Sequence, residues 1–430
     1  MKYSKSKVGA RCTCPTISGH MQYAPTPNPK QLIVSLPAKR RKDLDIIFLR
    51  REKGFNGADA DFSLPIGRGR SLWLFGDTLV GPRFNPPKYE MPRNAIGILH
   101  HNAKAKFVVP ALAGKTNPTV GADLFVCPLY RANTQVRPYK NSFPTDSLKK
   151  ERLPDPSTLK FTFHWRTENR RARAFFPAPK AGQWLWPGSA CVVNQKIYYF
   201  LHAFQTDNKN SKYDSFKFRR TGFRILRTDN PDDTPDNWNI EHINIPKLCD
   251  SVVWGISCFS GKDSFLYLWG ATRGHRKKGT VMARCPFEFL EENKGKGWEF
   301  FVERKSSPVW SYQSNHLHPL FNHRSPEMSL HYLEKQKIFL TVYEFHKDKS
   351  LGLRIARNIE GPWSHYQEFY RPPERDWNKH YFSYAPKAHP ELSPDGNELF
   401  ITYISNSLYP RDVFIDKRIY YPKFLALKLK

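Results

Sequence analysis

Residues 57–78 read GADADFSLPIGRGRSLWLFGDT, and the fold prediction depends on this stretch. Two apolar runs flank a turn at Arg68-Gly69, which is the signal of a tight β-hairpin. If the chain turns there, the numbers of opposed residues sum to about 136–137. Asp59 then lies opposite or diagonal to Asp77, so two carboxylates are expected on neighbouring strands.

The apolar second strand of this hairpin recurs four more times along the chain. Each copy follows a turn that contains Gly, Asn, Asp or Lys, and further extended segments come after it. After a longer first interval the copies are spaced roughly 60 to 75 residues apart, which is typical of the blades of a β-propeller. The five second strands are 72–76, 197–201, 265–269, 338–342 and 399–403.

We therefore predict an all-β fold, a five-bladed β-propeller of four-stranded antiparallel blades. The fifth unit ends before an outer strand, so an N-terminal strand at 31–38 is expected to close the ring. The first unit is expected to have its outer strand at 106–112 and then a loop-rich insertion at about 113–180. Residues 1–30 are expected to form a disordered or extended tail before a single propeller domain, 31–430.

Composition narrows the class of protein. The 430 residues carry 68 Lys and Arg against 39 Asp and Glu, a formal charge of +29, which favours polyanionic partners. A basic, solvated surface is the simpler explanation, and without a zinc-finger, RNA-recognition or basic-heptad spacing a nucleic-acid partner ranks last. No apolar stretch is long enough to span a membrane. The seven cysteines contain no CxxC pair, which argues against a structural zinc site, and they indicate no disulfide framework. Since no signal sequence is recognised either, we expect a cytoplasmic protein by default, and we also expect a monomer.

Paired carboxylates point to glycoside hydrolysis. Like charges this close are destabilising unless their pKa values separate, and one protonated beside one ionised carboxyl is the arrangement that cleaves a glycosidic bond. Asp59 and Asp77 would then be the acid and the nucleophile or base, with retention or inversion left open. The alternative is structural, because an Asp at a strand end also fastens a turn.

The starts of the other inner strands supply further candidates, since such strands begin around one mouth of a propeller. Glu327 is the only acid among them and is expected there as an accessory acid. Trp186 and Trp254 are candidates to stack on sugar faces, although ordinary blade packing explains each equally well. Tyr384 and His389 belong to the last unit. The histidine could act in acid–base chemistry, hold a metal or water, or be a hydrogen-bonded core residue.

Several sequence motifs resemble those of one bacterial family. They are the hairpin quoted above, RNAIGIL, WLWPGSACVVNQKIYYF, LRIARNIEGPWS and YAPKAHPEL. Over roughly residues 45 to 428 the chain resembles propellers of the domain-of-unknown-function 4185 and 5005 type, related to arabinanases, invertases and levansucrases. The resemblance implies a funnel-shaped site and paired hydrolytic acids in the first blade, at Asp59 and Asp77. It also implies a later glutamate and a histidine near a central ion, for which Glu327 and His389 are candidates. No cofactor is required, and a structural or channel calcium ion is compatible with the resemblance.

We therefore predict a glycoside hydrolase that acts on a furanosyl or acidic polysaccharide or oligosaccharide. Arg93 and Arg324 are expected to contact hydroxyl or acidic groups of the substrate. The alternative is a non-catalytic propeller that binds an acidic glycan or another polyanion, which the charge of +29 favours. An enzyme would present its acids to an open cleft, whereas a binder would show a basic, aromatic-lined mouth with its acids in ion pairs.

Overall fold

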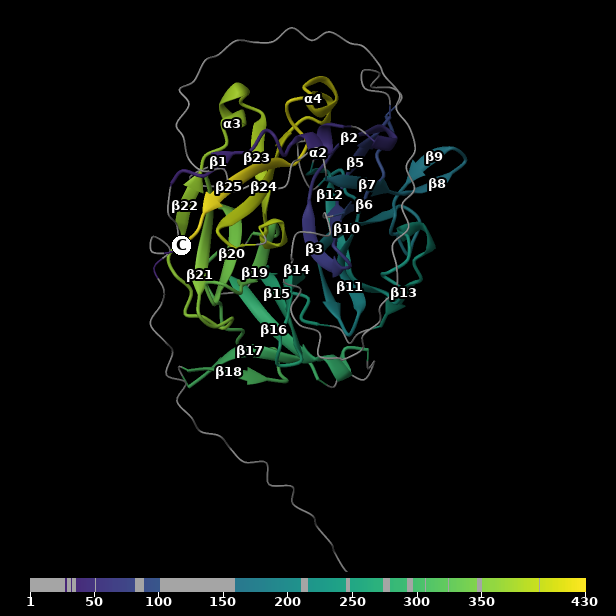
Figure 1. Ribbon diagram of the computed structural model, residues 1–430. Coiled ribbons are helices and arrows are strands. Elements are labelled where there is room, and N and C mark those ends of the chain that lie inside the picture. The colour runs from purple at the N-terminus through teal and green to yellow at the C-terminus, as the bar shows by residue number, and fades with distance from the viewer. Residues whose placement is uncertain are drawn as a thin grey trace, which may run out of the picture.

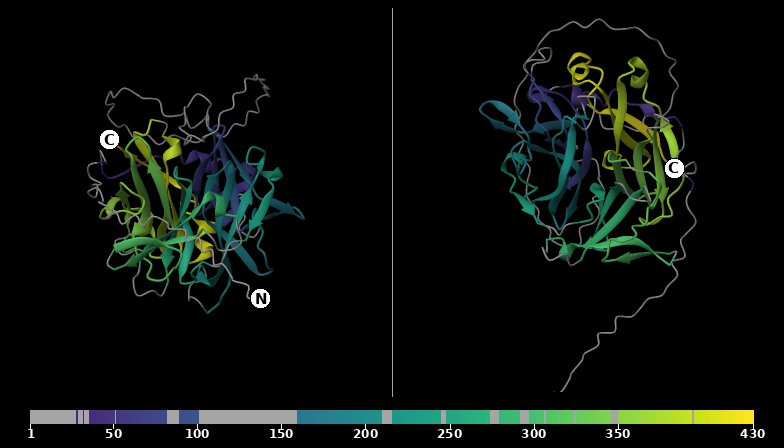
Figure 2. Two further views of the ribbon diagram at one scale, coloured as in Figure 1. Left: turned by 90° about the horizontal axis from the view of Figure 1, so that it is seen from below. Right: turned by 180° about the vertical axis from the view of Figure 1, so that it is seen from behind.

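The computed structural model contains five antiparallel β-sheets of four or five strands that follow one another around a ring (Figure 1). This arrangement confirms the predicted all-β, five-bladed β-propeller, and Figure 2 shows the same ring from below and from behind. No helix of the described residues is long and apolar enough to cross a membrane. The structure describes residues 28, 32, 36–50, 52–81, 89–100, 159–209, 216–244, 248–273, 279–291, 297–305, 307–323, 325–345, 350–393 and 395–430.

Within each sheet the strands follow one another from the channel outward. The first sheet contains β3 (Phe62–Gly67), β4 (Arg70–Phe75), β6 (Ala95–His100) and β7 (Lys160–His164). The second contains β10 (Gln183–Val193), β11 (Lys196–Thr206), β12 (Phe218–Thr228) and β13 (Ile240–Ile243). The third contains β14 (Val252–Ser260), β15 (Phe265–Thr272), β16 (Thr280–Pro286), β17 (Glu299–Arg304) and β18 (Ser307–Ser311).

The fourth sheet contains β19 (Met328–Leu333), β20 (Ile338–Phe345), β21 (Ser350–Ala356) and β22 (Gln367–Tyr370). The fifth contains β23 (Tyr381–His389), β24 (Glu398–Ser407), β25 (Lys423–Lys428) and β1 (Lys39–Arg40). Two small ribbons are β2 (Phe55–Ala58) with β5 (Thr78–Val80), and β8 (Arg166–Glu168) with β9 (Arg171–Arg173). The short helices are α2 (Ile46–Leu49), α3 (Glu374–Trp377) and α4 (Pro410–Ile415), with 3-10 turns η1 (Glu52–Gly54), η5 (Pro235–Asn237), η6 (Phe287–Phe289) and η7 (Pro390–Leu392).

The innermost strands form the wall of the central channel. In ring order, β3, β10, β14, β19 and β23 each contact the next, and β23 contacts β3. The ring is therefore closed at its centre. Because the strands have equivalent places in their blades, their N-terminal ends meet at one mouth of the channel.

The two chain ends close the ring at its rim. Lys39 and Arg40 of β1 pair with Ala426 and Leu425 of β25, so an N-terminal strand is the outer strand of the fifth sheet. The predicted closure is therefore present, but the strand begins just after the predicted segment 31–38. Most of that segment, and the predicted tail 1–30 apart from Asn28, lie outside the described residues.

The first hairpin has the predicted register. Phe62 pairs with Leu74 and Leu64 with Leu72, so the opposed numbers sum as expected. At the turn, Arg68 has a φ of 50° and Gly69 a φ of 64°. Positive φ at both central residues matches the right-handed twist of the two strands, which is why this short turn sets the register.

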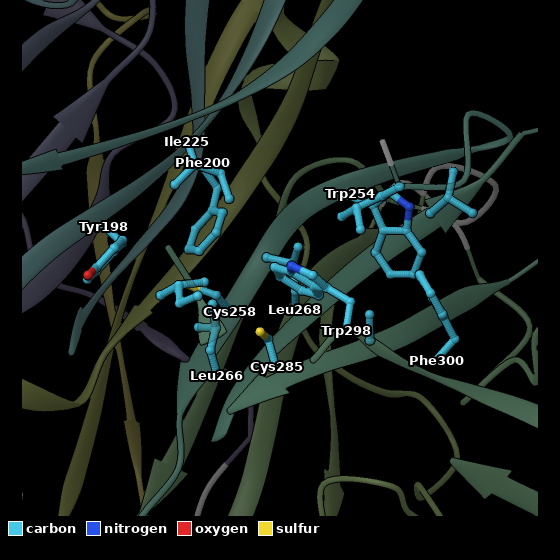
Figure 3. Packing of buried hydrophobic residues seen from close by; sticks show 14 of the residues in the cluster. Tyr198, Phe200, Ile225, Trp254, Cys258, Leu266, Leu268, Cys285, Trp298 and Phe300 are labelled. Carbon is cyan, nitrogen blue, oxygen red and sulfur yellow. The ribbon is translucent and has the colours of Figure 1, made fainter. Parts of the chain in front are cut away.

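The hydrophobic core is distributed between neighbouring sheets, and Figure 3 shows the cluster at the second and third. Trp254 is only 2% exposed and lies within this cluster beside Phe300, with the two ring centroids 5.8 Å apart. Cys191 and Cys258 are buried in the same cluster as free thiols. Inter-sheet packing of this kind fixes where each blade sits around the channel.

The predicted outer parts of the blades need two corrections. The outer place in the first sheet is taken by β7, whose register begins with Ile96 opposite His164. The predicted strand 106–112 lies outside the described residues, and β7 to β9 fall inside the predicted insertion, about 113–180. The third sheet also has a fifth strand, β18, which was not predicted. Short outer strands on a basic, Pro-rich background give little periodicity, so their pairing is decided by the sheet they join.

Candidate active site

The two predicted acids leave the first hairpin side by side. Ala58 of β2 pairs with Thr78 of β5, and the Gly76 amide donates to the Asp59 carbonyl at 2.9 Å. Asp59 and Asp77 therefore occupy neighbouring positions on the two paired segments, at the end from which β3 starts. They stand at the mouth where the N-terminal ends of the inner strands meet.

Gly76 makes room for one of these carboxyl groups. A Cβ atom at residue 76 would lie 2.3 Å from Oδ1 of Asp59, a separation that real Cβ atoms do not tolerate. The Phe-Gly-Asp-Thr motif thus supplies the acid Asp77 and, at Gly76, a residue without a side chain, against which the carboxyl of Asp59 packs.

Asp59 is held by the hydroxyls of Tyr384 and Tyr420, and within the described residues it forms no ion pair with a cation. The hydroxyl of Tyr384 donates to its Oδ2 at 2.5 Å, and Asn406 donates in turn to the Tyr384 oxygen at 3.2 Å. Burial, followed by the nearby charge of Asp77, raises the pKa of Asp59 to about 8, and the charge of Glu327 acts in the same direction. This carboxyl is therefore mostly protonated at neutral pH.

Asp77 has two strong donors. Nη1 of Arg93 donates to its Oδ2 at 2.8 Å, and Nε1 of Trp186 donates to its Oδ1 at 2.8 Å. The Tyr420 hydroxyl donates to the Asp77 carbonyl at 3.0 Å. Burial raises the pKa of Asp77, but Arg93 and Trp186 oppose that rise. Asp77 therefore loses its proton before Asp59, and its charge then helps to keep Asp59 protonated.

Glu327 is paired with a buried lysine. Nζ of Lys387 lies 3.1 Å from Oε2 of Glu327, and the two side chains are 2% and 33% exposed, respectively. Burial raises the pKa of Glu327, whereas the charge of Lys387 lowers it. A bulge between Tyr384 and Lys387, with Ala385 at a φ of 52°, offsets the N-terminal end of β23 from the regular ladder.

A further carboxyl lies behind this group. Asp61 is fully buried, and burial raises its pKa to about 7 against the opposing charge of Lys387. Ala60 and Asp61 have φ values of 73° and 36°, so the chain bends sharply between β2 and β3. Lys387 is therefore a cation shared by Asp61 and Glu327 at the inner side of the site.

Aromatic side chains of the second sheet lie next to the acids at the mouth of the channel. Trp186 packs against Phe204 and Phe218 with ring centroids 4.6 and 4.7 Å apart, and the Arg93 guanidinium stands 4.7 Å over the ring of Trp184. We call Trp184, Trp186, Phe204 and Phe218 the aromatic wall. Sugars bind to such amphipathic surfaces because their C–H faces are apolar and their edges are polar.

Two predicted substrate contacts lie in the core, and a third falls outside the described residues. Trp254 is buried between the second and third sheets, where its Nε1 donates to the Cys249 carbonyl at 3.2 Å, so it cannot stack on a sugar. His389 is fully buried and hydrogen-bonds Ser63 and Thr402, each at 2.6 Å, so it is a hydrogen-bonded core histidine and not a substrate contact. Arg324 lies outside the described residues.

Other residues at the site were missed. Lys387 lies within a predicted strand start but was given no role, although a lysine inside an apolar strand is itself a signal of a buried partner. Tyr420 comes from the chain between α4 and β25, and Trp184 lies two residues before Trp186. No local pattern announces Tyr420, because its contact with Asp77 joins residues far apart in the sequence.

The residues that the structure describes do not fit a calcium ion. Calcium takes six to eight oxygen ligands, usually including several carboxylates. No group of three or more His, Cys, Asp or Glu side chains in the described ranges is arranged to hold a metal. Asp77 and Glu327 instead pair with the cations Arg93 and Lys387.

Two surface cavities lie away from these acids. One of about 400 Å³ is lined by residues of the outer half of the second sheet, including Phe223 and His242. The other, of about 770 Å³, lies between the outer parts of the first and second sheets, beside Trp165 and Trp238. Neither cavity includes a predicted site residue.

Comparison with known proteins agrees with the fold. The model of the family described as "Domain of unknown function (DUF5005)" matches residues 43–428. A Bacteroides ovatus protein that is provisionally called a hydrolase matches with a TM-score of 0.61 and 15% identity, over 94% of this chain and 96% of that one. At this identity the likeness shows the fold alone.

Two further solved structures are more distant. A GH43_1 enzyme from Xanthomonas citri has a TM-score of 0.40 and 10% identity, over 91% of this chain and 94% of that one. CoXyl43, a β-xylosidase/α-arabinofuranosidase from a compost microbial metagenome, was solved with xylotriose in a calcium-free form. It has a TM-score of 0.41 and 12% identity, over 88% of this chain and 92% of that one. No curated protein matches the chain.

Proposed function

We propose that this chain, which belongs to the DUF5005 family, is a glycoside hydrolase with its acids at the mouth of the propeller. The observation that carries the proposal is the unequal setting of two adjacent carboxyls. Asp77 has an arginine and an indole as donors, whereas Asp59 has two tyrosine hydroxyls and two acidic neighbours. Two carboxyls whose pKa values are separated in this way can divide the roles of acid and base.

We assign one role to each carboxyl. Asp59 keeps its proton at neutral pH and is suited to donate it to the departing glycosidic oxygen. Asp77 ionises first and is suited to act as the base that activates water, or as the nucleophile. Glu327 contributes its charge, which favours the protonated form of Asp59.

The substrate we propose is a furanosyl or acidic polysaccharide or oligosaccharide. The aromatic wall offers stacking surface directly beside Asp77, since Trp186 belongs to the wall and also donates to that carboxyl. The Bacteroides ovatus protein that shares the fold is provisionally called a hydrolase, which agrees with a hydrolytic role. The positive charge of the chain favours the acidic members of this substrate class.

The test is a screen of purified protein against furanosyl and uronic-acid polysaccharides, with product analysis, followed by single variants. Asp59→Asn and Asp77→Asn should each lower the cleavage rate at least about 100-fold while the far-UV spectrum is unchanged. Asp43→Asn is the control, because Asp43 pairs with Arg41 on the surface. Full activity in both site variants on a genuine substrate would rule out the assignment.

A second candidate function is supported by the ion pairs. Asp77 with Arg93 and Glu327 with Lys387 match the pattern expected of a non-catalytic propeller that binds an acidic glycan. This alternative predicts binding of heparin with steep salt dependence and no product from any glycan of the screen. If the wild-type protein releases product from a glycan of the screen and Asp77→Asn does not, the protein is an enzyme.

A further inference from the structure

Two arginines flank the gap between the second and third sheets at the same end as the acids. Nη2 of Arg220, on β12, donates to the Val252 carbonyl at 3.3 Å, and the backbone amide of Arg273 donates to the Ser251 carbonyl at 2.5 Å. Arg220 and Arg273 therefore approach one two-residue segment at the N-terminal end of β14. The second and third sheets are neighbours in the ring (Figure 1).

The two guanidinium groups have no ion-pair partner among the described residues. In the part of the chain that the structure describes, neither forms an ion pair, and Nε of Arg220 is buried without a hydrogen-bond partner. A guanidinium has five N–H donors, and Arg220 uses one of them on a carbonyl oxygen. Arg220 is half-buried and Arg273 exposed, so the pair can be reached from solvent.

The surroundings do little to neutralise these charges. Burial, followed by the charge of Arg273, lowers the pKa of Arg220, and Asp250 is the acid that opposes this effect. His202 lies on the same side of the gap, and burial, opposed by its hydrogen bond to the Trp254 carbonyl, lowers its pKa to about 4, so it is neutral at pH 7 and adds no further positive charge. The charge of each arginine acts on the other at one end of the gap, and two neighbouring cations favour an anion between them.

The pair is adjacent to the aromatic wall. In the ladder of the second sheet, Phe204 is opposed to Trp184 on one side and to Arg220 on the other, so these three side chains share one face. Trp186, which donates to Asp77, is opposed to His202, two residues further along β11. A step of two residues along a strand is about 7 Å, so the arginines lie a short distance from the acids along the wall.

We infer that Arg220 and Arg273 form a subsite for an anionic substituent on the bound sugar chain, a uronic-acid carboxylate or a sulfate ester. The inference rests on the proposed function, because it assumes that the mouth binds carbohydrate. Arginine pairs with such oxyanions through two parallel hydrogen bonds, which gives geometry as well as charge. The aromatic wall lies between this subsite and Asp77. A sugar next to the one that carries the anionic group could therefore stack on the wall.

The test measures binding by calorimetry in the Asp59→Asn background, so that no substrate is consumed. The probes are an oligogalacturonate, a sulfated galactose oligosaccharide and a neutral galactose oligosaccharide of the same length. Arg220→Gln and Arg273→Gln should each weaken binding of at least one anionic probe about 10-fold or more, and change the neutral probe less than about 2-fold. The anionic probe that is affected identifies the oxyanion.

Arg224→Gln is the matched control. Arg224 is opposed to Leu201, so it projects from the other face of the same strand, and its Nη1 donates to the Phe223 carbonyl. It should leave all three affinities unchanged. Arg273→Gln alters an exposed side chain, so it tests the subsite even if Arg220→Gln fails to fold.

The outcomes separate this subsite from the proposed function. If the arginine variants lose anionic and neutral probes equally, or lose neither, the subsite is refuted whether or not the wild-type protein cleaves glycans. If no wild-type binding of any anionic probe is measured, it is refuted as well. Selective loss of an anionic probe in a protein that cleaves nothing would retain the subsite and reject the hydrolase.

Discussion

Replacing Asp59 by asparagine should remove a pH-dependent loss of stability. The folded protein holds Asp59 protonated up to a pKa of about 8, whereas in the unfolded chain the same carboxyl titrates near its ordinary pKa of 3.8. Between these values the folded state binds one more proton than the unfolded state. The contribution of Asp59 to the free energy of unfolding therefore falls as pH rises through this window.

The size of the effect follows from linkage. One proton corresponds to about 1.4 kcal/mol per pH unit, so Asp59 removes at most about 4 kcal/mol from the wild-type protein between pH 5 and pH 8. An asparagine side chain does not ionise and contributes no such loss. The free energy of unfolding of Asp59→Asn, relative to wild type, should therefore rise by up to this amount over the same interval.

The assay is urea denaturation of both proteins at pH 5 and pH 8, followed by tryptophan fluorescence. Asp43→Asn is the control, because the hydrogen bond from Arg41 lowers the pKa of Asp43 and its carboxyl is ionised in both states at both pH values. Its difference from wild type should not change with pH. If the difference for Asp59→Asn is equally constant, Asp59 is ionised in the folded protein and cannot be the proton donor.

Three further changes test individual contacts. Trp186→Phe keeps an aromatic ring but removes the donor to Asp77, so the acidic limb of the kcat/KM profile should move to higher pH, with a loss of roughly 10- to 100-fold in kcat. An unmoved limb would show that the indole does not tune Asp77. Trp254→Ala should lower the free energy of unfolding, measured in urea, by about 3–5 kcal/mol, because Trp254 is a core residue. It should leave the affinity of the folded protein for oligosaccharide unchanged, and reduced affinity would place Trp254 at the site instead. His389 is neutral in the folded state because burial lowers its pKa, so its contribution to the free energy of unfolding should fall as pH drops below about 6.5. The free energy of unfolding of His389→Gln, relative to wild type, should therefore rise between pH 7.5 and pH 5, and a constant difference would contradict the assignment.

The first blade shows how much a local pattern can predict. The turn at Arg68-Gly69 sets the hairpin register by its own backbone conformation, and the register alone brings Asp59 and Asp77 to neighbouring positions. Glu327 was placed at the mouth by the same kind of argument, from the start of an inner strand. Local hydrogen bonding and a period of two residues are properties of short segments, so they can be read from the sequence.

The roles within the site could not be read in this way. Trp186 and Trp254 start similar strands, yet one indole donates to Asp77 and the other is buried between two sheets. Tyr384, near the C-terminal end of the sequence, donates to Asp59 near its N-terminal end. Lys387 of the fifth blade pairs with Glu327 of the fourth. Which tryptophan is exposed depends on how neighbouring blades pack, and no segment contains that information by itself.

The sequence by itself determined the repeated hairpins, the number of blades and the adjacency of Asp59 and Asp77, because each is a matter of residues close together along one chain segment. Only the tertiary structure decided the protonation order of the two acids. That order depends on burial and on Arg93, Trp186 and Tyr384, and the closing of the ring brings the two aromatic residues to the acids from other blades. The pKa of a carboxyl responds to every charge and dipole within several ångströms, whichever part of the chain supplies it.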